Sequence, residues 1–218
     1  DVLRVERPLQ DSSSPEAGSS FERYQNIMSF SYDAFNRNKR SITLNLRTEA
    51  ARQIIYQLVK NSDVFLEGFR PGIAQRLGID YDTLAAINPQ LIYCSLSGYG
   101  KDGPYAELPG HDINYISVGG AQDMIGQRNG PHAIPMNFLA DWAGASLHGV
   151  ISFITKFPAR QRTGRGQYVD ISYVDGVISL ITPFAYEYFT NGTIYRRGEA
   201  FFNGGFACYN IYQTKDGK

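Results

Sequence analysis

Residues 40–97, RSITLNLRTEAARQIIYQLVKNSDVFLEGFRPGIAQRLGIDYDTLAAINPQLIYCSLS, decide the fold because three strand-like runs alternate in them with helix-like segments. Residues 40–46 alternate between polar and apolar side chains, which is typical of a strand with one buried face. Residues 63–67 and 91–97 are short apolar runs of the kind that forms buried strands. This strand–helix–strand–helix–strand order predicts an α/β protein with a parallel sheet and helices packed on it.

Capping residues mark where the helices between these strands begin and end. Thr48 precedes a helix with Glu49 in its first turn, and Asp80 can cap another helix. Pro71 suits the first turn of a short helix that stops at Gly78. Helices are therefore expected after Thr48, Pro71 and Asp80.

Weaker patterns extend this organisation in both directions. Upstream, residues 2–5 predict a strand, residues 9–20 a loop rich in Ser, Pro and Gly, and residues 21–35 an irregular, partly helical segment. Downstream, the predicted elements are helices at 111–118, 137–157 and 174–189 and strands at 168–171 and 206–213.

Both ends of the chain interrupt a pattern. The first strand has no initiator Met before it, and the hairpin signal Asp216-Gly217 has no returning strand after it. We expect a fragment of a longer gene product, or a chain trimmed at both ends for expression.

Composition and charge argue against several classes of protein. Twenty-one basic and 21 acidic residues give a formal net charge of +0, so no overall field attracts the chain to nucleic acid or to a membrane surface. No apolar run approaches the ~20 residues that span a bilayer, and no signal peptide is visible. Cys94 and Cys208 lie in apolar strand-like runs, which favours two buried, reduced thiols over a disulfide or a metal pair. We therefore expect a soluble cytoplasmic protein.

Basic residues near the predicted strands are candidates for an anion site. Because the net charge is zero, such a site must be local, and ligands of open α/β sheets bind at strand ends. The alternative is an ordinary solvated surface. The candidates are Arg37, Lys39, Arg40, Arg70, Arg162 and Arg165.

Three residues are candidates for chemistry. The segment Gly110-His-Asp-Ile-Asn-Tyr115 places the His111 imidazole beside the Asp112 carboxylate near a predicted helix start. Asp141 lies in an otherwise apolar helix, where it is either an exposed residue or a buried acid with a raised pKa. Each has a structural alternative, since His111 can be a satisfied structural histidine and Asp112 a helix cap or dipole partner.

Other catalytic classes find little support. His132 and His148 are interpreted as structural. The sequence has no Gly-x-Ser-x-Gly elbow and no clustered metal-ligand spacing, which disfavours a serine hydrolase and a zinc enzyme, and no metal is expected. Glycine spacings typical of dinucleotide and mononucleotide loops are also absent.

Several short motifs in a fixed order resemble family III CoA-transferases. Each is weak alone, but together they are highly specific, and they span nearly the whole chain. They are Asn36-Arg-Asn-Lys-Arg-Ser41, Phe69-Arg-Pro-Gly72, Leu91-Ile-Tyr, Ser97-Gly-Tyr-Gly100, Gly103-Pro-Tyr105, Gly164-Arg-Gly-Gln167 and Val169-Asp170.

The resemblance implies a fold and partners. It implies a Rossmann-like large domain, here residues 1–190, and the beginning of a smaller α+β domain, residues 191–218. It also implies a homodimer of interlocked chains with coenzyme A, as the acyl-CoA substrate, bound between domains and subunits. The matching residues that would line the nucleotide and phosphate region are Arg37, Lys39, Arg40 and Arg70.

The family divides by its chemistry. Its transferases use an aspartate nucleophile at the position of Asp141, whereas its racemase branch uses acid–base work at the α-carbon, with a histidine matched by His111 and the same aspartate. The intact segment 110–115 and the segment 136–141 favour the racemase branch, acting on a 2-methylacyl-CoA. Amides at the helix start near His111 are candidate donors for the enolate oxygen.

The resemblance also implies missing parts. The family's first strand and its C-terminal portion, with a glutamate that pairs with the catalytic histidine, lie outside these 218 residues. Without them we expect little or no activity, so an inactive CoA-binding fragment is a further alternative.

Overall fold

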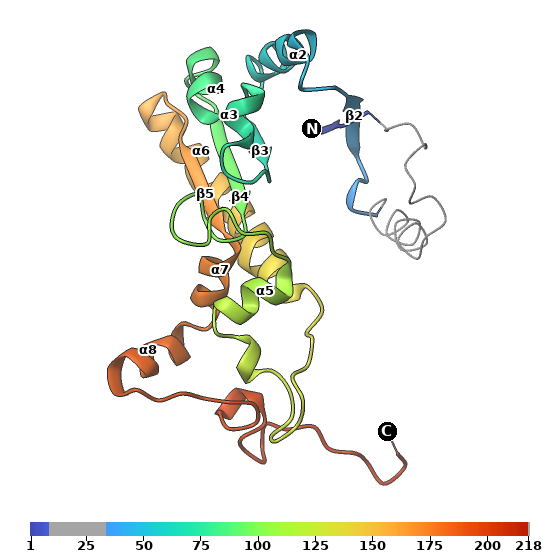
Figure 1. The fold of residues 1–218 in the computed structure, drawn as a ribbon, viewed down its shortest axis with the longest axis vertical. Helices are drawn as coiled ribbons and strands as arrows, with labels where there is room; N and C mark the ends of the chain where they lie inside the picture. Colours follow the sequence, from blue (N-terminus) through green and yellow to red (C-terminus); the bar gives the residue numbers. More distant parts are fainter. Residues whose placement is uncertain (9–33, 218) are drawn as a thin grey trace. The chain divides into compact units, whose positions relative to one another are not determined.

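The structure is a computed structural model that describes residues 1–8 and 34–217 (Figure 1). The predicted loop 9–20 and nearly all of the segment 21–35 lie outside the described residues. The chain divides into two compact units, Asp1–Gln57 and Leu58–Lys218. The predicted domain boundary near residue 190 stays a prediction.

The first unit contains a small parallel sheet and most of a helix. Strand β1 (Val2–Glu6) pairs in parallel with β2 (Lys39–Thr43), with Val2 opposite Lys39 and Glu6 opposite Thr43. Helix α2 (Glu49–Val59) begins where Thr48 accepts a hydrogen bond from the amide of Ala51 at 3.3 Å. The predicted strand and helix are confirmed, although the strand ends three residues earlier than expected.

The second unit is built on a parallel sheet with the order β3-β4-β5. Its strands are β3 (Val64–Glu67), β4 (Ile92–Ser97) and β5 (Tyr168–Ser172). The central strand β4 is buried except at Leu96, as its apolar run predicts. The α/β class with parallel strands is confirmed.

Helices cover both faces of this sheet (Figure 1). On one face, Ile92 and Cys94 pack against Phe153 and Phe157 of α6 (His148–Thr163). On the other face, Tyr93 stacks edge-on against Tyr81 of α4 (Tyr81–Ile87) and donates a hydrogen bond to the carbonyl of Ile79 at 3.1 Å. Alternation along β4 thus places successive side chains in two separate layers.

Local signals set the short helices on the second face. Helix α3 (Ile73–Leu77) ends at Gly78, whose φ of 68° lies in the left-handed region that favours glycine. Asp80 caps α4 by accepting a hydrogen bond from the amide of Thr83 at 3.2 Å. Both predicted boundaries are confirmed.

A second core lies beyond the ends of β4 and β5. It is formed by α5 (Asp112–Val118), the 3₁₀ turn η1 (Gln122–Met124), the π-helix η2 (Phe138–Leu147) and α7 (Tyr173–Leu180). Its buried residues are Tyr115, Ile116, Ala121, Ala140, Val174 and Val177. Helices η2 and α7 touch through backbone, because a Cβ on Gly176 would overlap the carbonyl of Gly144.

Two predicted helices differ in their detail. The helix expected at 137–157 is a π-helix up to Leu147 and then an α-helix that continues past Pro158 to Thr163. The helix expected at 174–189 is broken at Ile181 into α7 and α8 (Thr182–Asn191). A proline lies at the start of α8, where a helix needs no amide from it.

The strand predicted at 206–213 is wrong. In the structure residues 206–210 form turns and residues 211–213 are irregular. Phe206 and Tyr209 contact Phe201 of the 3₁₀ turn η3 (Phe201–Asn203), with ring centroids 5.0 and 6.0 Å from that of Phe201. Aromatic packing therefore replaces strand pairing. As a result Cys208 is exposed, which corrects the expectation of two buried thiols, whereas Cys94 is buried and both cysteines are free.

Among the described helices, none is both long and apolar enough to cross a membrane.

Candidate active site

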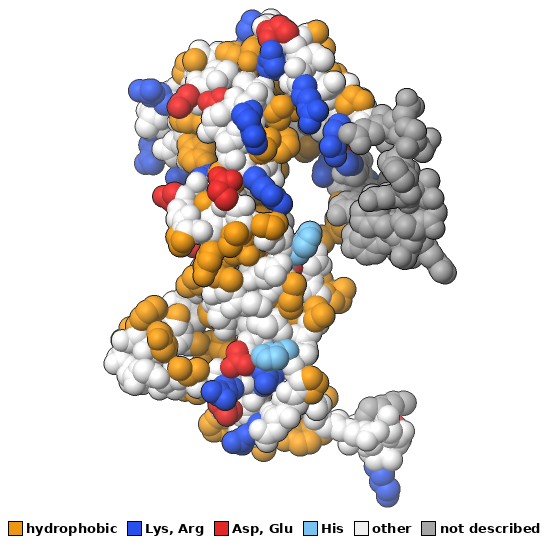
Figure 2. Space-filling model, in the orientation of Figure 1, with side chains coloured by type: hydrophobic (Ala, Val, Ile, Leu, Met, Phe, Trp, Pro, Cys, Tyr) orange, Lys and Arg blue, Asp and Glu red, His pale blue; other side chains and the backbone are white. Residues whose placement is uncertain are grey.

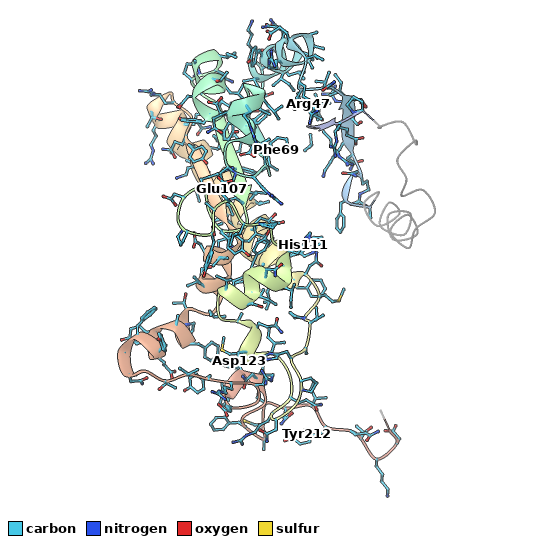
Figure 3. All side chains as sticks on the ribbon, in the orientation of Figure 1. Arg47, Phe69, Glu107, His111, Asp123 and Tyr212 are labelled. Carbon is cyan, nitrogen blue, oxygen red and sulfur yellow. The ribbon has the colours of Figure 1, made fainter. Side chains whose placement is uncertain are left out.

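The segment before α5 places His111 at a fixed turn. His111 is the N-cap residue of α5, and its amide donates a hydrogen bond to the side chain of Asn114 at 3.0 Å. The Tyr115 hydroxyl donates to the carbonyl of Gly110 at 2.6 Å. A side chain at Gly110 would collide with the Tyr115 ring, so glycine is required there. The His111 side chain is exposed at the start of α5 (Figure 3).

Asp112, by contrast, is buried in the protein. Its residue is only 7% exposed. Its Oδ2 atom accepts hydrogen bonds from the amides of Ala140 and Asp141, both at 2.9 Å. Two adjacent residues therefore have different roles: the His111 side chain is exposed to solvent, whereas the Asp112 carboxylate caps the first turn of η2.

Asp141 lies in that first turn and is half-buried. Burial raises the pKa of its carboxyl, and the negative charge of Asp112 raises it further. The Asn137 amide, which donates to Asp141 Oδ2 at 3.1 Å, and the nearby His111 imidazole lower that pKa. The structure thus brings His111, Asp112 and Asp141 within electrostatic reach of one another.

The wide turns of η2 leave carbonyl groups that side chains satisfy. Ser146 Oγ donates to the carbonyl of Asp141 at 2.7 Å, and His148 Nδ1 lies 2.8 Å from the carbonyl of Ala143. His148 Nε2 is also 3.2 Å from Ser179 Oγ on α7. These bonds agree with a structural role for His148. The π-helical form of η2 is itself of interest, because π-helical turns often occur at functional sites.

A group of tyrosines borders the same region. The rings of Tyr115 and Tyr173 are 5.0 Å apart, and those of Tyr99 and Tyr115 are 5.2 Å apart. Burial, with the charges of neighbouring groups that include Asp141, raises the pKa of Tyr115 to about 12. The positive charge of Arg70 acts in the opposite direction on this phenol, so Arg70 also lies within electrostatic reach of the site.

An ion pair that the sequence did not reveal holds the segment before Arg70. The Lys101 ammonium donates to Glu67 Oε1 at 3.2 Å and to the carbonyl of Phe69 at 3.1 Å. Glu67 also accepts hydrogen bonds from the amide of Phe69 and from the hydroxyl of Ser95. A glutamate at the end of an apolar strand-like run is the signal in the sequence that could have indicated such a pair.

The other predicted basic residues, Arg37, Lys39 and Arg40, are grouped in the first unit. Lys39 and Arg40 begin β2, and Arg40 lies 3.6 Å from Asp1, with both side chains largely exposed. Arg162 and Arg165 are exposed beside Gly164, which ends α6. Their binding of an anion stays a prediction.

His132 belongs to a different cluster. Arg197 Nη1 lies 2.9 Å from His132 Nδ1 and donates to Asp123 Oδ1 at 2.7 Å, which ties the segment after α8 to η1. This arrangement agrees with a structural His132. Within residues 1–8 and 34–217, the structure holds no group of three His, Cys, Asp or Glu side chains that would bind a metal ion.

Known proteins with similar sequences identify the family. The model of CoA-transferase family III matches residues 1–218. The α-methylacyl-CoA racemase of Homo sapiens is 35% identical over 217 residues, which cover 100% of this chain and 52% of the racemase. The β subunit of succinyl-CoA–L-malate CoA-transferase from Chloroflexus aurantiacus is 34% identical over 220 residues, which cover 100% of this chain and 53% of that subunit.

The fold has a similar counterpart among solved structures. The crystal structure of a CaiB/BaiF family protein from Brucella suis matches with a TM-score of 0.76 at 36% identity, over 90% of this chain and 52% of that one. This chain spans about half the length of the relatives that it matches. Because the family model covers every residue and the fold agrees with it, the chain belongs to CoA-transferase family III.

Proposed function

We propose that the protein is an α-methylacyl-CoA racemase-like isomerase that removes and returns the α-proton of a 2-methylacyl-CoA thioester. His111 and Asp141 are the acid–base pair. The observation that carries this proposal is the Asp112 carboxylate, which joins the segment of His111 to the first turn of the helix that holds Asp141.

The residue types suit proton exchange on two faces of one carbon. Inversion needs one group to take the α-proton and a second group to deliver a proton from the other side. An imidazole does this near neutral pH, and a carboxyl whose pKa is raised by burial holds a proton more readily than an ordinary aspartate. His111 and Asp141 come from different elements, α5 and η2, so they can flank a substrate.

The enolate formed between the two proton transfers needs hydrogen-bond donors at its oxygen. The first amides of a helix have no acceptor inside the helix. In α5 the amides of Asn114 and Tyr115 donate to the carbonyl of His111, so the candidates are the amides of Asp112 and Ile113. The Tyr115–Gly110 hydrogen bond fixes the turn before them. We assign this turn as the donor group for the thioester oxygen.

Coenzyme A is the proposed carrier of the acyl group. Its phosphates need cations, and Arg70 supports this assignment because its charge reaches Tyr115, next to the proposed acid–base pair. Arg37, Lys39 and Arg40 expose their side chains at the start of β2, where they are available to a polyanion. The Homo sapiens relative, whose name includes an acyl-CoA substrate, supports the same assignment.

A transferase is the second candidate, supported by the 34% identical succinyl-CoA–L-malate CoA-transferase subunit. In that reaction the ionised Asp141 carboxylate attacks the thioester carbonyl, an acyl–aspartyl anhydride forms and CoA thiolate leaves. A buried carboxyl with a raised pKa suits either role, so the preference for the isomerase rests on the intact segment around His111.

Deuterium exchange separates the two reactions. The full-length protein in which these residues occur is incubated with 2-methylacyl-CoA in D₂O without an acceptor acid. We expect deuterium at the α-carbon, and its loss in His111→Ala and Asp141→Ala but not in the matched control His132→Ala. Label exchange into a free acid with hydroxylamine trapping at Asp141, and no deuterium uptake, would establish the transferase instead. CoA binding by calorimetry without either activity would identify a CoA-binding protein.

We also propose a homodimer. Large apolar side chains are exposed on α8 and the segment after it (Figure 2). Phe189 of α8 is 82% exposed. Apolar surface of this kind favours association. Light scattering that gives the mass of a monomer would contradict the homodimer. The expected cytoplasmic location also stays a prediction.

A further inference from the structure

One buried carboxylate in the second unit joins the two proposed catalytic segments. Resting on the function proposed above, we infer that Asp112 is a positioning residue: its carboxylate holds the backbone of Asp141 in place and sets the charge beside the Asp141 side chain. Asp112 itself need not touch the substrate to do so.

The geometry separates this role from ordinary helix capping. An aspartate in the first turn of a helix usually interacts with its own helix. In α5 the Asn114 side chain bonds to the amide of the N-cap His111, and the Asp112 carboxylate is used elsewhere. It accepts the amides of Ala140 and Asp141, 28 and 29 residues further along the chain, each at 2.9 Å.

The same contacts fix two side chains at once. His111 precedes Asp112 directly, so anchoring Asp112 also anchors the backbone from which the imidazole projects. On the other side, the two hydrogen bonds hold the first turn of η2 at Asp141 itself. A shift of Asp112 therefore changes the distance between the acid and the base, and a misplacement of about 1 Å costs on the order of 100-fold in rate.

The charge of Asp112 acts on Asp141 through the protein interior. Its Oδ1 atom is buried and accepts no hydrogen bond from the described residues. No described ion pair includes Asp112. Three side chains act on the Asp141 carboxyl: Asn137 from its own segment, and His111 and Asp112 from the start of α5. The phenols of Tyr115 on α5 and Tyr173 on α7 also lie within electrostatic reach of it.

Two substitutions distinguish the effect of the Asp112 hydrogen bonds from the effect of its negative charge. Asp112→Asn keeps an oxygen that can accept the two amides but removes the negative charge, so the pKa of Asp141 falls. Asp112→Ala removes both the charge and the hydrogen bonds, so Asp141 loses its anchor as well. The matched control is Asp82→Asn, which changes an exposed aspartate in the first turn of α4, away from this site.

The experiment measures α-proton exchange against pH and the titration of Asp141 by ¹³C NMR, both in the full-length protein. For Asp112→Asn we expect the Asp141 titration and the limb of the pH profile that it governs to move to lower pH. For Asp112→Ala we expect exchange to fall on the order of 100-fold while CoA binding is retained. Asp82→Asn should match the wild type in every measurement.

The results distinguish this inference from the proposed function. If the Asp112 variants are folded by circular dichroism and leave the Asp141 titration and the pH profile unchanged, the inference is overturned. If the wild type exchanges no α-proton but the Asp141 titration still moves in Asp112→Asn, the proposed function fails and the link between Asp112 and Asp141 stands.

Discussion

Replacing Glu67 tests whether the ion pair at the end of β3 stabilises the second unit. The Glu67 side chain is 2% exposed and accepts hydrogen bonds from Phe69, Ser95 and Lys101. Removing one partner of a buried ion pair costs about 3–5 kcal/mol. Lys101 is 22% exposed and keeps its bond to the Phe69 carbonyl, so we expect Glu67→Ala to cost about 3 kcal/mol, at the lower end of that range.

Urea unfolding measures this loss. With an m-value of about 2 kcal/mol/M, a loss of 3 kcal/mol lowers the midpoint by about 1.5 M. The matched control is Asp63→Ala, just before the same strand. The Asp63 side chain is 70% exposed, so its ion pair with Arg160 contributes only about 0–1 kcal/mol to stability. Glu67→Gln keeps an acceptor oxygen and should lie between the two. If Glu67→Ala lowers the midpoint no more than Asp63→Ala does, the buried pair does not stabilise the sheet.

Three further predictions concern the second core and the proposed site. Tyr115→Phe removes the hydroxyl bond to the carbonyl just before His111, and we expect a loss of about 1 kcal/mol in urea unfolding together with slower α-proton exchange. Gly176→Ala forces a methyl group against the backbone of Gly144 and should lower the free energy of unfolding by at least about 2 kcal/mol. The control Gly149→Ala meets only ordinary contacts inside α6 and should stabilise the protein by about 0.5–1 kcal/mol. Equal melting temperatures for the two variants would contradict the close approach of η2 and α7. Because the folded-state pKa of Asp141 is raised, its ionisation costs stability at neutral pH and no longer does so below the unfolded pKa of about 4. Asp141→Asn should therefore raise the melting temperature at pH 7 and raise it much less at acidic pH, and a gain that does not depend on pH would contradict this reasoning.

The elements set by local chemistry were predictable from the sequence. Asp80 begins α4 because its side chain caps the helix, and Gly78 ends α3 because its backbone adopts a left-handed conformation. Both boundaries agree with the structure. Apolar runs likewise placed β3 and β4 to within a residue. The strand expected at 206–213 failed because a strand depends on a partner, and Phe201 offers these aromatic residues a different contact.

The residues of the candidate site were chosen from the sequence and stay a prediction, whereas the hydrogen bonds that link their segments come from the structure. Motif resemblance singled out His111 and Asp141, and in the structure Asp112, the neighbour of His111, accepts a hydrogen bond from the Asp141 amide. The hydrogen bonds from Ala140 and Asp141 to Asp112 join residues far apart in the chain, so no local pattern could indicate them. A sequence pattern shows that an aspartate occupies a first turn, but it does not show which helix that aspartate caps.

Backbone contact between two glycines explains how Asp141 reaches its position. The apolar composition of residues 138–147 is compatible with a helix in many orientations, yet Gly144 allows η2 to approach the backbone of Gly176 on α7. This contact fixes the second half of η2, while Asp112 fixes its first turn. Because both constraints act on a helix of 10 residues, we expect small changes at either contact to move the Asp141 carboxyl. The position of Asp141 therefore depends on residues that need not contact the substrate.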